Sequence, residues 1–182
     1  MAKTAKKQKL PANLVKYLAK TGVKHKILEH KTVYTAFDAA ATMRRKLNEI
    51  VKTLFIKADK DYYLVLLPAD QSLDFKKLAK CIGATQKKKI KVVKIPGEKI
   101  MSEFLKIKAG ALSAFGALHK LPVVIEKKLA QVKKAVFPSG SFNHSVEMAV
   151  KDFVKLEKAI LGSFGVKKKI KPMKVRKVGK KK

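Results

Sequence analysis

The 182-residue sequence has one cysteine, Cys81, and no tryptophan, and its acidic side chains are few. A single cysteine excludes an intramolecular disulfide, which fits a reducing compartment. The longest apolar run, residues 62–69, is far shorter than the roughly 20 residues that a membrane-spanning helix needs. The basic N-terminus also lacks the apolar run of a signal peptide. We therefore expect a soluble, cytoplasmic protein.

The common motifs of nucleotide and metal enzymes are also missing. The sequence has no GxxxxGK, GxGxxG or HExxH segment and no paired-cysteine metal pattern. This argues against a nucleotide, dinucleotide or zinc enzyme of the usual kinds. No Ser/His/Asp or Cys/His set is recognisable from spacing, although such a set can be assembled in space alone.

Lysine is what the sequence has in excess. Lys and Arg number 44 against 13 Asp and Glu, a net charge of +31. A field of this size attracts polyanions, RNA above all, by releasing condensed counterions, and it also attracts anionic membranes. Residues 1–9 and 167–182 contain no acidic side chain, yet the remainder still has a net charge of +17. General lysine enrichment is the alternative to selection for RNA. The expected RNA contacts in the tail are Lys167, Lys168, Lys169 and Lys171.

Hydrophobic periodicity predicts an α+β, or mixed α/β, domain over residues 10–165, between a basic N-terminal tail (1–9) and a lysine-rich, disordered C-terminal tail (166–182). We expect a mixed, mostly antiparallel sheet flanked by helices. A first helix is predicted after Pro11, with Leu14, Val15 and Leu18 on one face, and a second after a Thr35–Asp38 capping box, with a face that reaches Leu47. A third helix is predicted to begin after Ser72 and to stop at Gly83. Two more are predicted at 100–105 and 153–160. Strands are predicted at 26–30, 49–57, 62–67, 90–95, 122–125, 134–137 and 145–150, with a hairpin turn at 59–61.

Lys52 has an unusual place in the second of these strands. Alternation puts it on the same face as Ile50, Leu54 and Ile56. A solitary buried ammonium is costly, so Lys52 either lines an opening or has an anionic partner. In a chain so rich in lysine, a chance placement is the alternative.

Two loops carry further candidate residues. Segment 110–116 (GALSAFG) is free of charge, and its glycines permit N–H groups to face a carbonyl or a phosphate. The alternative is a buried connector that needs small residues. Segment 139–144 (SGSFNH) combines hydroxyls, an amide and an imidazole, or it is an ordinary polar turn. From the pattern alone, His30 and Cys81 are interpreted as structural.

In their order and spacing, these features resemble the YbaK / aminoacyl-tRNA synthetase-associated domain family over about residues 10–165. No single piece is specific, but their succession is. The pieces are His30, Thr35-Ala36, Ala39-Ala40, 51–54, 64–83, 110–116, 122–126, 139–141 and 145–148. The resemblance therefore implies a single YbaK-like domain.

The resemblance also implies a function: a metal-independent aminoacyl-tRNA deacylase that acts in trans on mischarged tRNA and needs no cofactor. The partner is then the aminoacylated 3′ end of tRNA, with an aminoacyl-tRNA synthetase as a further candidate. The amino acid is expected to be small, such as Cys, Ala or Ser, on tRNA for proline or another amino acid. Lys52 aligns with the family's essential lysine, and segment 110–116 with the loop that holds the aminoacyl ester. The expected substrate-binding residues are His30, Thr35, Gly110, Ser113, Ala114, Phe115, Gly116, Gly140, Ser141 and His144.

Three positions depart from the family pattern. Ala114 stands where proline is common, Glu126 where Asp is usual, and Pro138 enters the segment before the Gly140 turn.

An activated ester needs no strong nucleophile, because positioned water, backbone N–H donors and a lysine can supply much of the acceleration. The alternative function is a non-catalytic RNA-binding or synthetase-associated module on the same fold.

Overall fold

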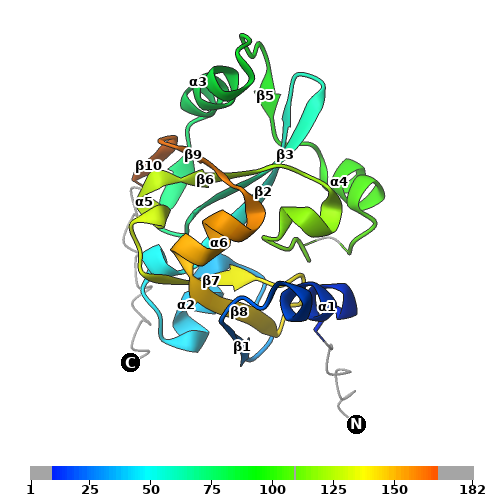
Figure 1. Cartoon of the computed structure of the whole chain (residues 1–182), viewed down its shortest axis with the longest axis vertical. Coiled ribbons are helices and arrows are strands. Elements are labelled where there is room, and N and C mark those ends of the chain that lie inside the picture. Colours follow the sequence, from blue (N-terminus) through cyan, green and yellow to red (C-terminus); the bar gives the residue numbers. More distant parts are fainter. Residues whose placement is uncertain (1–9, 109, 168–182) are drawn as a thin grey trace, which may run out of the picture.

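The computed structural model of the protein describes residues 10–108 and 110–167. These residues form an α+β fold in which short helices pack around three β-sheets (Figure 1). The helices are α1 (Ala12–Thr21), α2 (Ala36–Met43), α3 (Phe75–Gln86), α4 (Glu98–Leu105), α5 (Lys127–Ala130), α6 (Val150–Glu157) and the 3₁₀ helices η1 (Leu47–Glu49) and η2 (Gly116–His119). The strands are β1 (His25–Glu29), β2 (Val51–Ala58), β3 (Asp61–Pro68), β4 (Gln71–Leu73), β5 (Val93–Lys94), β6 (Val123–Glu126), β7 (Lys134–Pro138), β8 (His144–Ala149), β9 (Ile160–Gly162) and β10 (Gly165–Lys167).

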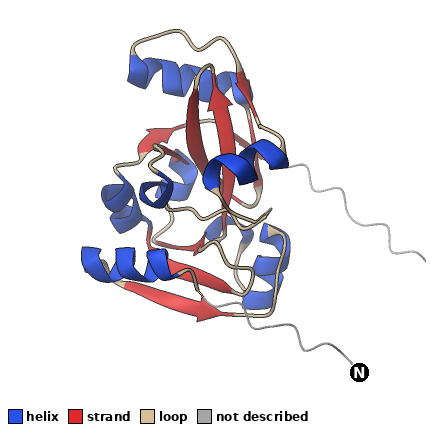
Figure 2. Ribbon diagram, turned by 90° about the vertical axis from the view of Figure 1, so that its right-hand side faces the viewer, coloured by secondary structure: helices blue, strands red, loops and turns tan. Residues whose placement is uncertain are grey.

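The sheets are mostly antiparallel, as predicted. The largest has the order β5-β2-β3-β6-β9, and only its β3–β6 and β6–β9 pairs are parallel. The order β1-β8-β7 makes a three-stranded antiparallel sheet, and β10 pairs antiparallel with β4. The three-stranded sheet and α3 lie at opposite ends of the molecule (Figure 1 and Figure 2). The candidate site lies between the three-stranded sheet and the first residues of β2.

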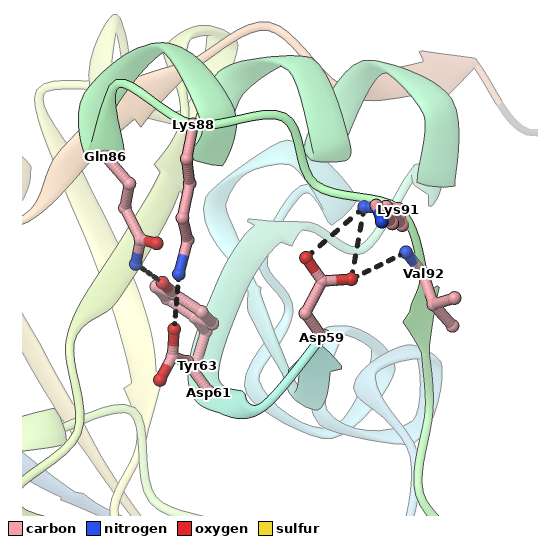
Figure 3. Close-up of polar contacts among 7 residues, drawn as sticks. All are labelled: Asp59, Asp61, Tyr63, Gln86, Lys88, Lys91 and Val92. Atoms are coloured by element: carbon pink, nitrogen blue, oxygen red, sulfur yellow. Dashed lines mark hydrogen bonds and ion pairs between the residues drawn. The ribbon is translucent and has the colours of Figure 1, made fainter.

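The predicted β2–β3 hairpin is confirmed, with Asp59 and Lys60 in its turn. Asp59 has a φ of 51°, a left-handed conformation that Asp tolerates better than most residues. Its carboxylate accepts hydrogen bonds from the N–H groups of Lys91 and Val92 at 2.8–3.3 Å (Figure 3). Two further contacts join the same regions, Lys88 to Asp61 and Gln86 to Tyr63. These contacts hold the β2–β3 hairpin against the end of α3 and the segment that leads to β5.

The two faces of β2 pack into different parts of the core. Phe55 joins the cluster that contains the stacked rings of Phe137 and Phe153, whose centroids are 4.1 Å apart. Ile56 joins the separate cluster beneath α3. This is the predicted alternation, and it leaves Lys52 on the same strand face as Ile56.

The predicted limits of α3 are wrong at both ends. Ser72 lies in β4, where it pairs with Val166 of β10. The helix is capped instead by Asp74, whose carboxylate accepts a hydrogen bond from the N–H of Lys77 at 3.0 Å. The helix also continues past Gly83 to Gln86. A Cβ at Gly83 would lie 2.7 Å from the Lys88 carbonyl oxygen, so this glycine permits a close approach rather than ending the helix.

Other predicted elements end earlier than expected. The chain turns into the left-handed region at Arg44 and Lys158 (φ 51° and 49°), so Leu47 and Ile160 lie outside α2 and α6. The strand expected at 90–95 is reduced to β5. Val15, expected on the buried face of α1, is 48% exposed. The sequence did not indicate where α2 and α6 end, because the left-handed residue after each helix is Arg44 or Lys158 and not glycine.

Two residues expected in the C-terminal tail lie in strand β10. Val166 and Lys167 were placed in the tail but pair with Ser72 and Gln71. Lys168, Lys169, Lys171 and the tail at 1–9 lie outside the described residues. Among the helices that the structure describes, none is long and apolar enough to cross a membrane.

Candidate active site

A cavity of about 180 Å³ lies where the three-stranded sheet meets the start of β2. Its walls come from the β1–α2 connection, α2, residues 50–53, residues 110–112, β7 and the turn into β8. Six of the predicted site residues border this one cavity although they are far apart in the sequence. They are His30, Thr35, Lys52, Gly110, Gly140 and Ser141.

Lys52 is half-buried at the cavity wall, and its Nζ donates a hydrogen bond of 2.5 Å to the carbonyl oxygen of Gln71. Gln71 lies in β4 opposite Lys167 of β10. The sequence left two explanations for Lys52, an opening or an anionic partner. The structure places Lys52 at an opening, and the backbone carbonyl of Gln71 accepts a hydrogen bond from its ammonium group.

His30 is fixed in the cavity wall through both ring nitrogens. Its Nδ1 lies 2.8 Å from the carbonyl oxygen of Lys31, and its Nε2 lies 2.9 Å from the hydroxyl of Ser145. A carbonyl can only accept, so Nδ1 carries the proton, and in the neutral ring Nε2 accepts from Ser145. This makes His30 a rigid part of the wall.

One end of the cavity is apolar. Thr35 caps α2 by accepting the N–H of Asp38 at 3.1 Å, which confirms that half of the capping box. The helix then presents small side chains to the cavity. The apolar lining residues here are Ala36, Ala39, Met43, Ile50 and Val136.

The glycine loop is divided between two environments. Gly110 borders the cavity with a φ of 79°, and a Cβ there would lie 3.3 Å from the Phe142 ring. Gly140 has a φ of 87° and faces Gly110's neighbour Ala111. Both positions therefore need glycine, the first for backbone conformation and close ring contact, the second for conformation.

The second half of the loop is buried away from this cavity. Ala114 and Phe115 are 0% exposed, and the Ala114 N–H donates to the Pro138 carbonyl at 3.0 Å. The Phe115 N–H donates to Ser113 Oγ at 3.2 Å. A Cβ at Gly116 would collide with the Leu121 carbonyl oxygen. Here the buried-connector interpretation describes the loop, and these N–H groups are engaged within the protein.

The turn at 139–144 closes on itself. Ser139 Oγ donates to the carbonyl of His144 at 2.6 Å, and Ser141 Oγ donates to Asn143 Oδ1 at 2.8 Å. The His144 ring Nδ1 lies 2.8 Å from the same Asn143 oxygen. Ser141 borders the cavity, whereas His144 is half-buried and does not line it.

A second hollow of about 300 Å³ lies beside the first and shares Ala111, Gly140, Ser141 and Phe142 with it. Ser113 and His119 also line it. Burial lowers the pKa of His119, so its imidazole is neutral at pH 7. Its Nε2 is buried, with no hydrogen-bond partner in the part of the chain that the structure describes.

The other His, Cys, Asp and Glu side chains that the structure describes form no metal site. Within residues 10–108 and 110–167, no group of three or more His, Cys, Asp or Glu side chains is placed to hold a metal ion. Cys81 is half-buried, and a Cβ at Gly162 would collide with its sulfur. Burial raises the pKa of the Cys81 thiol, which disfavours the thiolate and fits the packing role that the sequence indicated.

The residues that border the cavity but were not predicted as site residues include Tyr34, Phe142 and Ser145. Tyr34 directly precedes the Thr35 cap, and an aromatic residue beside a helix start at a candidate site is a usable signal. Phe142 lies inside the turn that was singled out for its polar groups. Ser145 belongs to the 145–148 piece of the family resemblance, but nothing marked it as a site residue, because its role depends on the imidazole of His30.

The sequence matches the model of the aminoacyl-tRNA editing domain over residues 30–156. The prolyl-tRNA editing protein ProX of Acetoanaerobium sticklandii is 30% identical over 144 residues, which are 75% of this chain and 84% of that protein. Two solved structures, both 20% identical, share the fold. One is a candidate trans-editing enzyme for prolyl tRNA synthetase (TM-score 0.71, 88% of this chain and 99% of that chain), and the other is described as a hypothetical protein (TM-score 0.75, 84% and 99%). The matched region contains every residue that borders the cavity. The chain therefore belongs to the aminoacyl-tRNA editing domain family, as its resemblance to YbaK-like domains predicted.

Proposed function

We propose that the protein hydrolyses the ester of mischarged aminoacyl-tRNA in trans. The observation that carries this proposal is the meeting of Lys52 and Gly110 on one small cavity, from segments almost 60 residues apart. The family of the chain supports the same chemistry, and so does its similarity to ProX, which is named as a prolyl-tRNA editing protein. On this basis, tRNA for proline is the first substrate to test.

The chemistry requires little from the protein because an aminoacyl ester is already activated. Holding water, or a hydroxyl of the substrate, beside the ester carbonyl supplies much of the acceleration. The Lys52 ammonium, oriented by the Gln71 carbonyl, is positioned to polarise the ester or to hold the ribose or terminal phosphate. Any N–H donor from the glycine loop must come from its cavity end at 110–112, since the later N–H groups are engaged.

The dimensions of the cavity support a small amino acid. Its volume is about 180 Å³, and the end formed by Ala36, Ala39 and Met43 is apolar. We propose Cys, Ala or Ser as the amino acid removed. If the pocket fits one of these side chains, we expect each added methylene to change the discrimination by on the order of 1–3 kcal/mol.

The decisive experiment incubates the protein with a panel of mischarged tRNAs and follows loss of the ester. We expect Cys, Ala or Ser esters to be cleared well above the spontaneous rate. Lys52→Ala should lower kcat/KM by about 100- to 1000-fold, as when one preorganised donor to a reacting group is removed. Lys57→Ala is the matched control, because Lys57 lies on the same strand with its Nζ 5.3 Å from the Tyr62 ring centroid, outside the cavity.

The outcomes separate the competing functions. If no ester is cleared above the spontaneous rate, the enzyme proposal fails and an RNA-binding or synthetase-associated module takes its place. If Lys52→Ala keeps full activity, the deacylase survives but its proposed site does not. Metal independence is tested separately with EDTA, which should leave the rate unchanged.

The C-terminal tail is proposed to hold the tRNA body. Lys167 is exposed at the end of β10, so a deletion that preserves the fold should begin at Lys168. The deletion removes nine basic residues and no acidic one. For each phosphate that the shortened protein no longer neutralises, the slope of log affinity against log salt should become shallower by about 0.9. An unchanged slope would contradict the role of Lys168, Lys169 and Lys171.

A further inference from the structure

An exposed aromatic side chain stands at the rim of the cavity. Tyr34 is 77% exposed, the most exposed large apolar or aromatic residue that the structure describes. Its ring centroid lies 5.3 Å from that of Phe142, with the ring planes at 50°. Both residues border the cavity that also contains Lys52. The exposed ring can therefore present its face to a ligand at the edge of the cavity.

The aromatic pair is held in place by the backbone. The N–H of Val33 donates to the Phe142 carbonyl at 2.9 Å, and the N–H of His30 donates to the Asn143 carbonyl at 3.0 Å. The edge of the Phe142 ring also packs close to Gly110, where there is no Cβ to displace it. Phe142 is therefore wedged between Gly110 and Tyr34, and the pair is preorganised as a surface beside the ester site.

The position of the pair indicates what it faces. In an aminoacyl-tRNA, the ester that enters the cavity is attached to unpaired nucleotides at the 3′ end, so their bases must lie at its rim. Unpaired bases bind proteins by stacking on aromatic rings, with cationic side chains near the phosphates. Lys31 and Lys108 are exposed, and they adjoin His30 and the glycine loop along the chain.

We propose that the Tyr34–Phe142 pair is a stacking platform for a base of the unpaired 3′ end of tRNA. The proposal rests on the proposed function for the identity of the RNA. In this role Tyr34 is a positioning residue: it contacts the base rather than the ester, and it contributes more to KM than to kcat.

The test measures RNA binding without catalysis. Fluorescence anisotropy compares an uncharged acceptor-stem hairpin that ends in unpaired CCA with the same hairpin lacking CCA, at fixed low salt. We expect the intact protein to prefer the CCA hairpin and Tyr34→Ala to reduce that preference by about 5- to 30-fold, the lower part of the range for base stacking. Tyr34→Phe keeps the ring and should keep the preference.

Phe75→Ala is the matched control, since Phe75 is 40% exposed at the start of α3 and is not among the residues that line the cavity. A weakening in Tyr34→Ala that is equal for both hairpins, or no weakening, overturns the proposal. A Tyr34→Ala variant that loses binding to a synthetase while keeping its CCA preference also overturns it in favour of a protein contact. If the preference depends on Tyr34 but no ester is hydrolysed, the proposed function fails and the platform stands.

Discussion

Replacing Glu126 by alanine should destabilise the fold more than replacing any exposed acid. The Glu126 side chain is 1% exposed, and its Oε2 accepts hydrogen bonds of 2.6 Å from the N–H groups of both Phe164 and Gly165. Its Oε1 accepts a longer bond of 3.3 Å from Lys128 at the start of α5. The carboxylate therefore joins the end of β6 to the turn between β9 and β10.

The size of the effect follows from these hydrogen bonds. A hydrogen bond to a charged group contributes roughly 1.5–3 kcal/mol, and leaving a buried donor unpaired costs a similar amount. Phe164 is 0% exposed, so water cannot replace the carboxylate there, whereas Gly165 is only half-buried. We expect Glu126→Ala to lower the free energy of unfolding by about 3–5 kcal/mol.

Urea unfolding followed by far-UV circular dichroism measures this destabilisation. Glu126→Gln keeps one carbonyl oxygen and should lose about half as much. Glu126→Asp is one methylene shorter and should fall between the two. Glu103→Ala, an exposed acid on α4, is the control and should stay within about 0.5 kcal/mol of the wild type.

Glu126→Ala should also affect the candidate active site. The β9–β10 turn positions β10, β10 pairs with β4, and the Gln71 carbonyl of β4 orients Lys52. Glu126→Ala should therefore lower deacylation at temperatures where the protein is still folded. A destabilisation smaller than about 1 kcal/mol, with unchanged activity, would refute this account of the carboxylate.

Three further predictions concern single side chains or hydrogen bonds, each measured by urea unfolding. Ala114→Pro removes the N–H that donates to the Pro138 carbonyl and should cost about 1–3 kcal/mol, whereas Ala114→Gly, which keeps that N–H, should keep the bond. Burial raises the pKa of Glu157 above its ordinary value of 4.5. The stability of the wild type relative to Glu157→Gln should therefore fall as the pH rises from 4.5 through the raised pKa. A relative stability that rises with pH would contradict this. Asp59→Ala should lose about 1–3 kcal/mol, because two N–H groups lose their acceptor and alanine is strained at this φ, and Asp59→Asn should lose less.

Features that depend on neighbours in the chain were predictable. The hairpin follows from two alternating strands around Asp59, and the start of α2 follows from the Thr35 cap. The face of Lys52 follows from the period of two in a strand. Each of these rests on interactions within a few residues or on the geometry of a single element.

Features that depend on distant partners were not predictable in this way. Ser72 is as good a cap as Asp74 by type, but β10 recruits Ser72 into a strand pair. The glycine loop has uniform composition, yet Gly110 meets the cavity while Gly116 is packed against Leu121. Burial is decided by what packs from elsewhere in the chain.

The sequence by itself therefore determined the family, the α+β class and the residue types that can carry the chemistry, because these follow from order, spacing and alternation. Only the tertiary structure decided which of those residues share one cavity, that Gln71 orients Lys52, and that Tyr34 and Phe142 form its rim. The physical reason is that a cavity is made by surfaces of separate segments, and its shape depends on packing that no single segment encodes.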